Sequence, residues 1–160
     1  MNIRHAKMSD LDAVAYVESV CFPPERACSK ERFAGRLQYY PNHFHLLFLD
    51  EKLISFTDGF VTDEKDLRDE MYEDPSLHDE NGRWQMLFGV NTLPEYRNHG
   101  YAGILIKDMI RQAKEEQKAG LVLTCLEEKI HWYASFGFVN EGISSSEHGG
   151  VTWYQMRLSF

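Results

Sequence analysis

The sequence predicts a single α/β domain over residues 1–160, built on a mixed sheet with helices on both sides. Three observations support this prediction. The length, with 43% hydrophobic and 26% charged residues, is typical of one globular domain. Strand and helix patterns follow the order β-α-α-β-β-β-α-β-α-β-β, which contains seven strands. Between residues 84 and 118, a strand, a short turn and a long amphipathic helix succeed one another.

The N-terminal part of the chain is predicted as a short strand and two helices. The strand covers residues 2–5, and Ser9 and Asp10 are favourable N-caps for a helix over about residues 10–20. Two consecutive prolines then stop helix propagation. Ser29 is expected to cap the second helix. The residues expected to face inward are Leu11, Val14, Val17 and Cys21 in the first helix, and Phe33 and Leu37 in the second.

A hairpin and an acidic excursion lead to the central strand. Residues 44–49 and 53–61 are predicted to pair around a turn at residues 50–52. Residues 62–83 are polar and acidic, with a helical turn or two around residues 67–72, and long ordered loops are often functional. The central strand is expected over residues 84–92, where its pattern ends before Pro94.

The turn after the central strand has the chemistry of an anion site. Arg97 offers a planar fork of donors, and Gly100 lets the backbone approach a ligand closely. The unpaired amide groups and the positive dipole end of the next helix also favour phosphate. That helix is expected to start near Gly100 and run to about Lys118. Its apolar stripe contains Ala102, Leu105, Ile106, Met109, Ile110 and Ala113.

The C-terminal part is predicted to complete the sheet. Gly120 is expected at the helix C-cap, and residues 121–125 form a buried strand. A short helix over residues 129–136 is followed by Gly137. Residues 138–143 and 151–158 are predicted as the last two strands.

Composition excludes several classes of function. No stretch approaches the roughly 20 apolar residues of a membrane span, and the first residues lack a signal-peptide pattern, so a cytoplasmic protein without a membrane partner is expected. The net charge of −8 argues against nucleic acid and is compatible with a cationic substrate. The three cysteines show no C-x-x-C spacing, so neither a disulfide framework nor a metal site is predicted.

Two motifs carry a resemblance to a known family. The run Arg97-x-x-Gly100-x-Ala102 resembles the Arg/Gln-x-x-Gly-x-Gly/Ala signature of the GNAT superfamily of N-acetyltransferases. Residues 131–138, His-Trp-Tyr-Ala-Ser-Phe-Gly-Phe, are similar to a second pattern of that superfamily. The loop over residues 21–27 resembles the aralkylamine N-acetyltransferase-like branch. The resemblance covers essentially the whole chain and implies the GNAT fold.

The resemblance also implies the reaction and its residues. The amine of a small molecule would attack the thioester of acetyl-CoA directly, and Tyr133 would protonate the CoA thiolate. A phenol, with an ordinary pKa of about 10, is protonated at neutral pH. Backbone amides at the end of the central strand would polarise the carbonyl. The cofactor-binding residues implied are Val90, Asn91, Thr92, Arg97, Asn98, His99, Gly100, Tyr101 and Ala102.

The chain lacks the residues that serve as general base in the aralkylamine branch of the family. Aralkylamine enzymes carry two histidines on the central strand, where this chain has Met86 and Phe88, and neither side chain accepts a proton. The residues considered for the base or for acceptor binding are Glu18, Glu25, Glu70, Glu73 and His148.

Several alternatives stay open at this point. The fold could serve as a non-catalytic acyl-CoA-binding or partner-binding module, or it could acetylate a peptide amine docked on the acidic excursion. A nucleotide-binding domain is disfavoured, because Gly100 to Gly103 contains no Gly-Lys-Ser/Thr. His43 and His45, two residues apart on a predicted strand, lack a third ligand for a metal. Cys125 is predicted as a core residue, and the protein as a monomer or homodimer.

Overall fold

The computed structural model describes residues 1–146 and 148–160, and the side chains of all of these except His148. The chain folds as two compact units. The first unit comprises residues 1–59 and 89–109, and the second comprises residues 60–88 and 110–160. Each unit has its own sheet, so each is described by itself.

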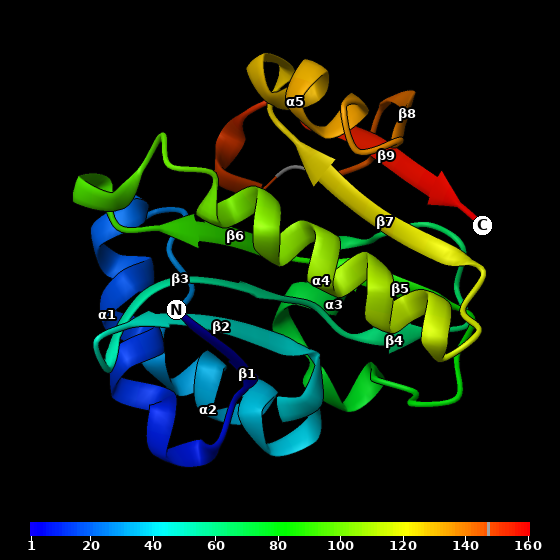
Figure 1. Ribbon diagram of the computed structural model, residues 1–160. Helices are drawn as coiled ribbons and strands as arrows, with labels where there is room; N and C mark the ends of the chain where they lie inside the picture. The colour runs from blue at the N-terminus through cyan, green and yellow to red at the C-terminus, as the bar shows by residue number, and fades with distance from the viewer. Residues whose placement is uncertain (147) are drawn as a thin grey trace. The chain divides into compact units, whose positions relative to one another are not determined.

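The first unit is built on a four-stranded antiparallel sheet in the order β1-β2-β3-β6 (Figure 1). Its strands are β1 (Asn2–His5), β2 (Phe44–Leu49), β3 (Lys52–Asp58) and β6 (Gly89–Thr92). Phe56 pairs with Asn91, and Asp58 pairs with Gly89. Because side chains alternate along a strand, Phe56, Asp58 and Asn91 share one face of this sheet.

Two helices cover that face. They are α1 (Leu11–Cys21), preceded by the 3-10 turn η1 (Met8–Asp10), and α2 (Lys30–Tyr39), followed by η2 (Pro41–His43). The Ser29 side chain accepts a hydrogen bond from Arg32 N at 3.2 Å, as the capping prediction requires. Phe33 packs edge-on against Phe44 and Phe56 under α2. This aromatic cluster is the apolar core beside the polar residues described below.

Helix α4 (Tyr101–Glu115) ends earlier than predicted. Gln117 adopts a left-handed conformation, with φ 60°, and Lys118 N donates to Ala113 O at 2.9 Å, so a Schellman motif closes the helix. Gly120 was predicted at this cap, and that prediction was wrong. It instead opens strand β7 (Gly120–Cys125), where an added Cβ would collide with Leu158 O on the neighbouring strand.

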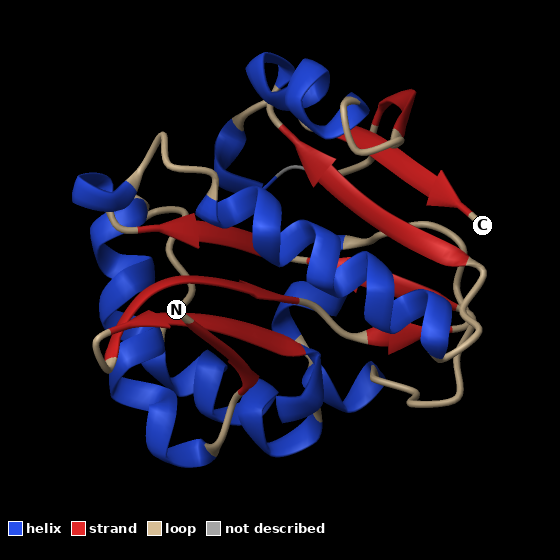
Figure 2. Cartoon of the chain, in the orientation of Figure 1, coloured by secondary structure: helices blue, strands red, loops and turns tan. Residues whose placement is uncertain are grey.

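The second unit contains a five-stranded sheet in the order β4-β5-β7-β9-β8. Figure 2 draws all strands of the chain as red arrows. Among the described strands of this sheet, only β5 and β7 pair in parallel, and their pairing stops at Leu87 and Leu123 although β7 continues to Cys125. Helix α5 (Ile130–Ala134), preceded by η5 (Glu127–Lys129), follows β7 (Figure 1). The strands are β4 (Val61–Thr62), β5 (Trp84–Leu87), β7 (Gly120–Cys125), β8 (Val139–Ile143) and β9 (Tyr154–Ser159).

The acidic excursion is fixed to the second unit by specific contacts. It contains α3 (Asp69–Glu73) and η3 (Pro75–Leu77), in agreement with the predicted helical turns. Arg157 forms an ion pair with Asp66 at 2.8 Å and donates to Lys65 O. The Tyr72 hydroxyl lies 2.9 Å from Thr124 Oγ1. The excursion is therefore ordered structure joined to β7 and β9.

Two predicted strands are each divided in the structure. The segment predicted as residues 53–61 forms β3 and β4, and the segment predicted as residues 84–92 forms β5 and β6. The second break falls at Phe88, whose ring packs against Phe60 and Tyr72. The described residues thus form nine strands in place of the seven expected, while the mixed α/β fold agrees with the prediction. No helix in the described part of the chain is long and apolar enough to cross a membrane.

Candidate functional site

The loop between β6 and α4 has the geometry of an anion site. A 3-10 turn, η4 (Pro94–Tyr96), follows β6, and Asn98 and Gly100 then adopt left-handed conformations with φ 65° and 83°. The first helical hydrogen bond runs from Ile104 N to Gly100 O at 3.1 Å. The amides of the first helical turn have no carbonyl of their own helix to bond. They are available to bind an anion.

Space is present where a ligand would approach this loop. An atom added at the Cβ position of Gly100 would meet nothing within 4 Å. Arg97, Asn98 and His99 are exposed around it, and Tyr101 and Ala102 are half-buried. The His99 ring is held by Arg97 O, 2.8 Å from Nδ1. The phosphate groups of a nucleotide-containing cofactor fit these exposed donors.

Strand β6 presents an open edge beside the loop. Leu93 N donates to Ile54 O, so the alternating pattern of an antiparallel pair directs the amides of Val90 and Thr92 away from β3. Within the described residues, no strand pairs with this second edge. Amides at an unpaired strand edge can polarise a carbonyl group.

Tyr133 lies in the second unit, on α5. It is buried, with 8% of its surface exposed, and its ring packs edge-on against Trp132 and Phe138. Burial, reinforced by the nearby Cys125 and Tyr72, raises the pKa of the phenol above its ordinary value. Tyr133 is therefore a neutral hydroxyl throughout the physiological pH range.

The predicted acceptor residues occupy different surroundings. Glu25 is exposed in the turn after α1, where Ala27 N donates to Pro23 O. Glu70 and Glu73 are exposed on α3, and Glu70 forms an ion pair with Arg68. His148 opens the 3-10 turn η6 (His148–Gly150), and its side chain lies outside the described structure. The structure thus gives no shared site to these four residues, and their roles stay predictions.

A buried polar cluster in the first unit was not predicted from the sequence. Glu18 on α1 retains 6% of its surface and accepts a hydrogen bond from Cys28 N at 2.8 Å. The Asn91 amide on β6 is a further polar neighbour of Glu18. Beside them, Arg36 Nη1 donates to Asp58 Oδ2 at 2.8 Å. The sequence does carry a signal, because Glu18 lies four residues after Val14, on the inward stripe of α1.

Burial controls the ionisation of this cluster. Desolvation raises the pKa of Glu18 to about 7, against the lowering effect of the Cys28 amide. Desolvation also raises the pKa of the Cys28 thiol, to about 12, and that of the Tyr40 phenol. These two groups are therefore neutral at pH 7, whereas Glu18 is close to half-ionised.

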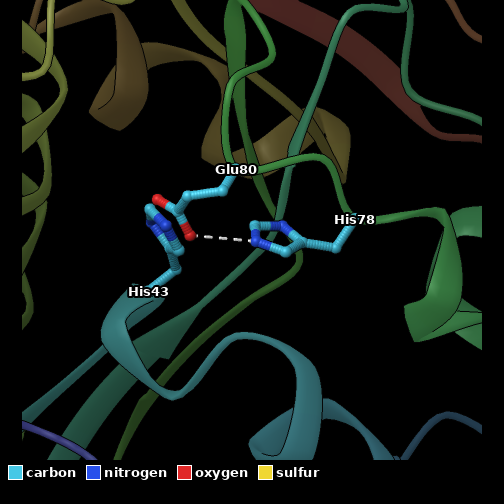
Figure 3. Close-up of side chains that lie close together, drawn as sticks. All are labelled: His43, His78 and Glu80. Carbon is cyan, nitrogen blue, oxygen red and sulfur yellow. Dashed lines mark hydrogen bonds and ion pairs between the residues drawn. The ribbon is translucent and has the colours of Figure 1, made fainter.

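The histidines predicted as neighbours on a strand are placed differently. His43 ends η2, and only His45 lies on β2, where its Nδ1 is 2.7 Å from Asp108 Oδ2. The expectation that a single strand carries both rings was wrong. In the second unit, Nε2 of His78 lies 3.1 Å from Oε1 of Glu80 (Figure 3). The Nδ1 atom of the same ring accepts from Val61 N at 3.0 Å, which ties this loop to β4.

Cys125 agrees with its predicted role. It is buried in β7, and desolvation raises the pKa of its thiol to about 11. Its Sγ contacts Met156 Sδ at 3.6 Å. A thiol that stays protonated at pH 7 is a poor nucleophile.

Solved structures share this fold over nearly the whole chain. The loading GNATL domain of CurA from Lyngbya majuscula has a TM-score of 0.86 at 18% identity, covering 99% of this chain and 96% of that one. The GphF GNAT-like decarboxylase in complex with isobutyryl-CoA has a TM-score of 0.86 at 20% identity, covering 99% of both chains. The ribosomal-protein-alanine N-acetyltransferase from Brucella melitensis has a TM-score of 0.71 at 16% identity, covering 100% of both chains.

Comparison at the level of families gives a direct assignment. No curated protein matches the chain. The model of the acetyltransferase (GNAT) family matches residues 8–138, which is well over half of the sequence. This match contains the loop, the open edge of β6, Glu18 and Tyr133. The protein belongs to the acetyltransferase (GNAT) family.

Proposed function

We propose that the protein is an acyl-CoA-dependent N-acyltransferase that moves an acetyl group from acetyl-CoA to a primary amine of a small molecule. The observation that carries the proposal is the loop between β6 and α4. Its left-handed Asn98 and Gly100, exposed Arg97 and free first-turn amides form an anion site in a chain of the acetyltransferase (GNAT) family.

Each part of the loop has a defined task in this proposal. The amides around Gly100 to Ala102 bind the pyrophosphate, and Arg97 adds a cation. At the open edge of β6, the amide of Val90 points away from β3 and is assigned to donate a hydrogen bond to the carbonyl oxygen of the thioester. The residues assigned to the cofactor are Val90, Asn91, Thr92, Arg97, Asn98, His99, Gly100, Tyr101 and Ala102. When bound, acetyl-CoA supplies an activated acyl thioester.

Tyr133 is assigned as the general acid. A thiolate that leaves a thioester needs a proton, and a neutral phenol can donate one. The raised pKa of Tyr133 keeps the proton on the oxygen at neutral pH, so the phenol is present in the form that can donate. The packing of Trp132 and Phe138 around the ring fixes its orientation.

The class of acceptor is proposed from the charge of the chain. A small amine suits a protein of net charge −8. The aralkylamine branch rests only on the loop over residues 21–27. Peptide amines are a second possibility through the acidic excursion, and peptide turnover that is unchanged after neutralising its carboxylates would exclude it. The residues to neutralise are Asp69, Glu70, Glu73 and Asp74.

A second candidate reaction is decarboxylation of an acyl-CoA. It is favoured by one observation, the TM-score of 0.86 to a GNAT-like decarboxylase, which exceeds the 0.71 to the Brucella acetyltransferase. Release of carbon dioxide from dimethylmalonyl-CoA, whose decarboxylation yields isobutyryl-CoA, would identify this reaction. Thiol release that depends on an added amine would identify acyl transfer.

Isothermal titration of the purified protein tests the cofactor first. Acetyl-CoA and CoA are expected to bind, because they share the pyrophosphate and the pantetheine arm. ATP, which lacks that arm, is expected to bind far more weakly. Absence of binding by acetyl-CoA and CoA would refute the assignment of the loop. A non-catalytic module would bind acetyl-CoA and release no thiol with any amine.

A further inference from the structure

We propose that Glu18 is the general base that deprotonates the acceptor amine, with Asn91 as the residue that positions its carboxylate. This inference rests on the proposed N-acyltransferase function and adds the proton acceptor that the central strand lacks. At the two histidine positions of the aralkylamine enzymes, this chain has Met86, which is fully buried, and Phe88, which packs on Phe60 and Tyr72.

The face of α1 that carries Glu18 lies against β6. Cys21, one helical turn after Glu18, donates to Thr92 O at 3.3 Å. The same carbonyl accepts a hydrogen bond from Arg97 Nε at 3.0 Å. Glu18 is therefore one turn of helix from the start of the loop assigned to the pyrophosphate. Its partner Asn91 is a residue of the strand whose open edge is assigned to the thioester.

Asn91 is the second, independent sign of a ligand site. Its side chain is buried, with 1% exposed. Its side-chain oxygen and nitrogen have no geometrically satisfactory hydrogen-bond partner within the described residues, although the amide lies near enough to Glu18 to favour its carboxylate. A buried amide in this state costs stability unless a ligand or water completes its bonds. An acceptor ammonium group in contact with both residues could donate to Asn91 Oδ1 and to the Glu18 carboxylate.

The charges of the cluster favour a cationic acceptor. Arg36 and Asp58 neutralise one another through their hydrogen bond. Cys28 and Tyr40 stay protonated. Among the described residues Glu18 makes no direct ion pair, and Arg36, which lowers the pKa of Glu18 by its charge, is hydrogen-bonded to Asp58. A bound ammonium group would add a direct partner for ionised Glu18. The titratable or charged groups that interact with Glu18 or its neighbours are Cys21, Cys28, Arg32, Arg36, Tyr40, Asp58 and Arg97.

The protons balance in this scheme. Glu18 takes one proton from the ammonium group, directly or through one water, and the free nitrogen forms the C–N bond as the C–S bond breaks. Tyr133 gives its proton to the sulfur. The nitrogen loses a second proton, which replaces that of Tyr133 through solvent, and Glu18 returns its own proton to solvent. One proton is released for each amide formed.

The test uses the whole chain with n-butylamine and alaninamide as probes, and follows thiol release from acetyl-CoA between pH 6 and 9. The wild-type rate of thiol release is expected to fall as the pH is lowered through about 7, which forms the acidic limb of the pH profile. Glu18→Gln, which keeps the shape of the side chain, is expected to lose about a hundredfold in rate at pH 7.5 and to lack this limb. Asn91→Leu is expected to move the limb to higher pH, because the amide lowers the pKa of Glu18.

Controls separate this inference from the proposed function. Glu31→Gln removes an exposed glutamate on α2 and should leave the profile unchanged. Acetyl-CoA binding by titration calorimetry should be equal in wild type and Glu18→Gln. Equal binding, with amine-dependent thiol release and the same pH profile in both proteins, would overturn the role of Glu18 alone. Absence of acetyl-CoA binding in the wild type would overturn the proposed function as well.

A second measurement needs no acceptor, so it tests the role of Glu18 even if the protein acetylates neither of the two amines. An infrared pH titration follows the carboxylic acid C=O band that is present in wild type and absent in Glu18→Gln. A midpoint near pH 7 supports the proposal. A midpoint near the ordinary 4.5 of a glutamate would overturn it.

Discussion

Arg97 Nε donates a hydrogen bond to Thr92 O at 3.0 Å, across the turn that joins β6 to α4. This bond fixes the stem of the guanidinium on the strand end, while the residue as a whole is exposed. The guanidinium also interacts with the Cys21 thiol on α1, and it adds a cation to the loop that leads into α4, where an anion is favoured.

Arg97→Ala should therefore weaken acetyl-CoA binding by about tenfold, because a hydrogen bond to a charged group contributes about 1.5–3 kcal/mol and solvent screens part of it here. Gly100→Val should weaken binding further, since its φ of 83° favours glycine and a side chain would fill the open space above it. Titration calorimetry measures both effects. Lys107→Ala, which removes an exposed cation farther along α4, serves as the matched control, and an equal loss there would argue against a specific loop.

Tyr133→Phe should lower kcat by about a hundredfold with little change in acetyl-CoA affinity, because it removes one hydroxyl group and general acids contribute about 10²–10⁴-fold. The ring contacts with Trp132 and Phe138 remain in the variant. Steady-state thiol release across pH gives the comparison. Wild-type rates at every pH would remove Tyr133 from the mechanism.

Glu18 should make the stability of the protein fall as the pH rises. Its pKa is raised from 4.5 to about 7, so the folded state binds the proton more tightly than the unfolded state does. This contribution is complete below pH 4.5, is lost between 4.5 and 7, and is absent above that range. One pKa unit corresponds to about 1.4 kcal/mol, so the loss is on the order of 3 kcal/mol.

Urea unfolding of wild type and Glu18→Gln at pH 5 and pH 8 measures this loss. The wild type should lose about 3 kcal/mol relative to the variant, which has no proton to release at this position. Glu31→Gln should follow the wild type. A constant difference between wild type and Glu18→Gln across this range would contradict the raised pKa.

Arg36→Met should cost about 3–5 kcal/mol of unfolding free energy, because it leaves Asp58 buried without its cation. Both side chains are nearly inaccessible, with 4% and 1% of their surface exposed. The double variant Arg36→Met/Asp58→Leu should recover much of the loss, since neither member of the ion pair is then left buried without its partner. Chemical unfolding of the single and double variants checks this. A double variant as unstable as the single one would show that shape, and not charge, dominates.

Gly120→Ala should destabilise the second unit severely, because a Cβ would collide with Leu158 O and come within 3.0 Å of the Trp84 ring. Both neighbours belong to strands paired with β7, so neither can move cheaply. Gly142→Ala is the comparison, since its Cβ would meet nothing within 4 Å and only its φ of 96° is strained. That strain should cost about 1–2 kcal/mol. Thermal unfolding should rank Gly120→Ala well below it.

The sequence predicted the elements that local chemistry defines. The Ser29 cap, the proline stop before η4, the hairpin turn and the stripe of α4 were all found near their predicted positions. The Arg97-x-x-Gly100-x-Ala102 loop was predicted because its residues are contiguous and their conformations follow from glycine and proline. Each of these features involves residues a few positions apart, so propensity and periodicity contain the information.

Tertiary structure decided the features that depend on distant residues. The break at Phe88 follows from ring contacts with Phe60 and Tyr72. Gly120 is required by a strand that lies much later in the chain, although local reasoning assigned it to a helix end. The cluster of Glu18, Arg36, Asp58 and Asn91 joins four separate segments. Burial determines the ionisation of such groups, and a local sequence pattern does not show how far folding will remove each group from water.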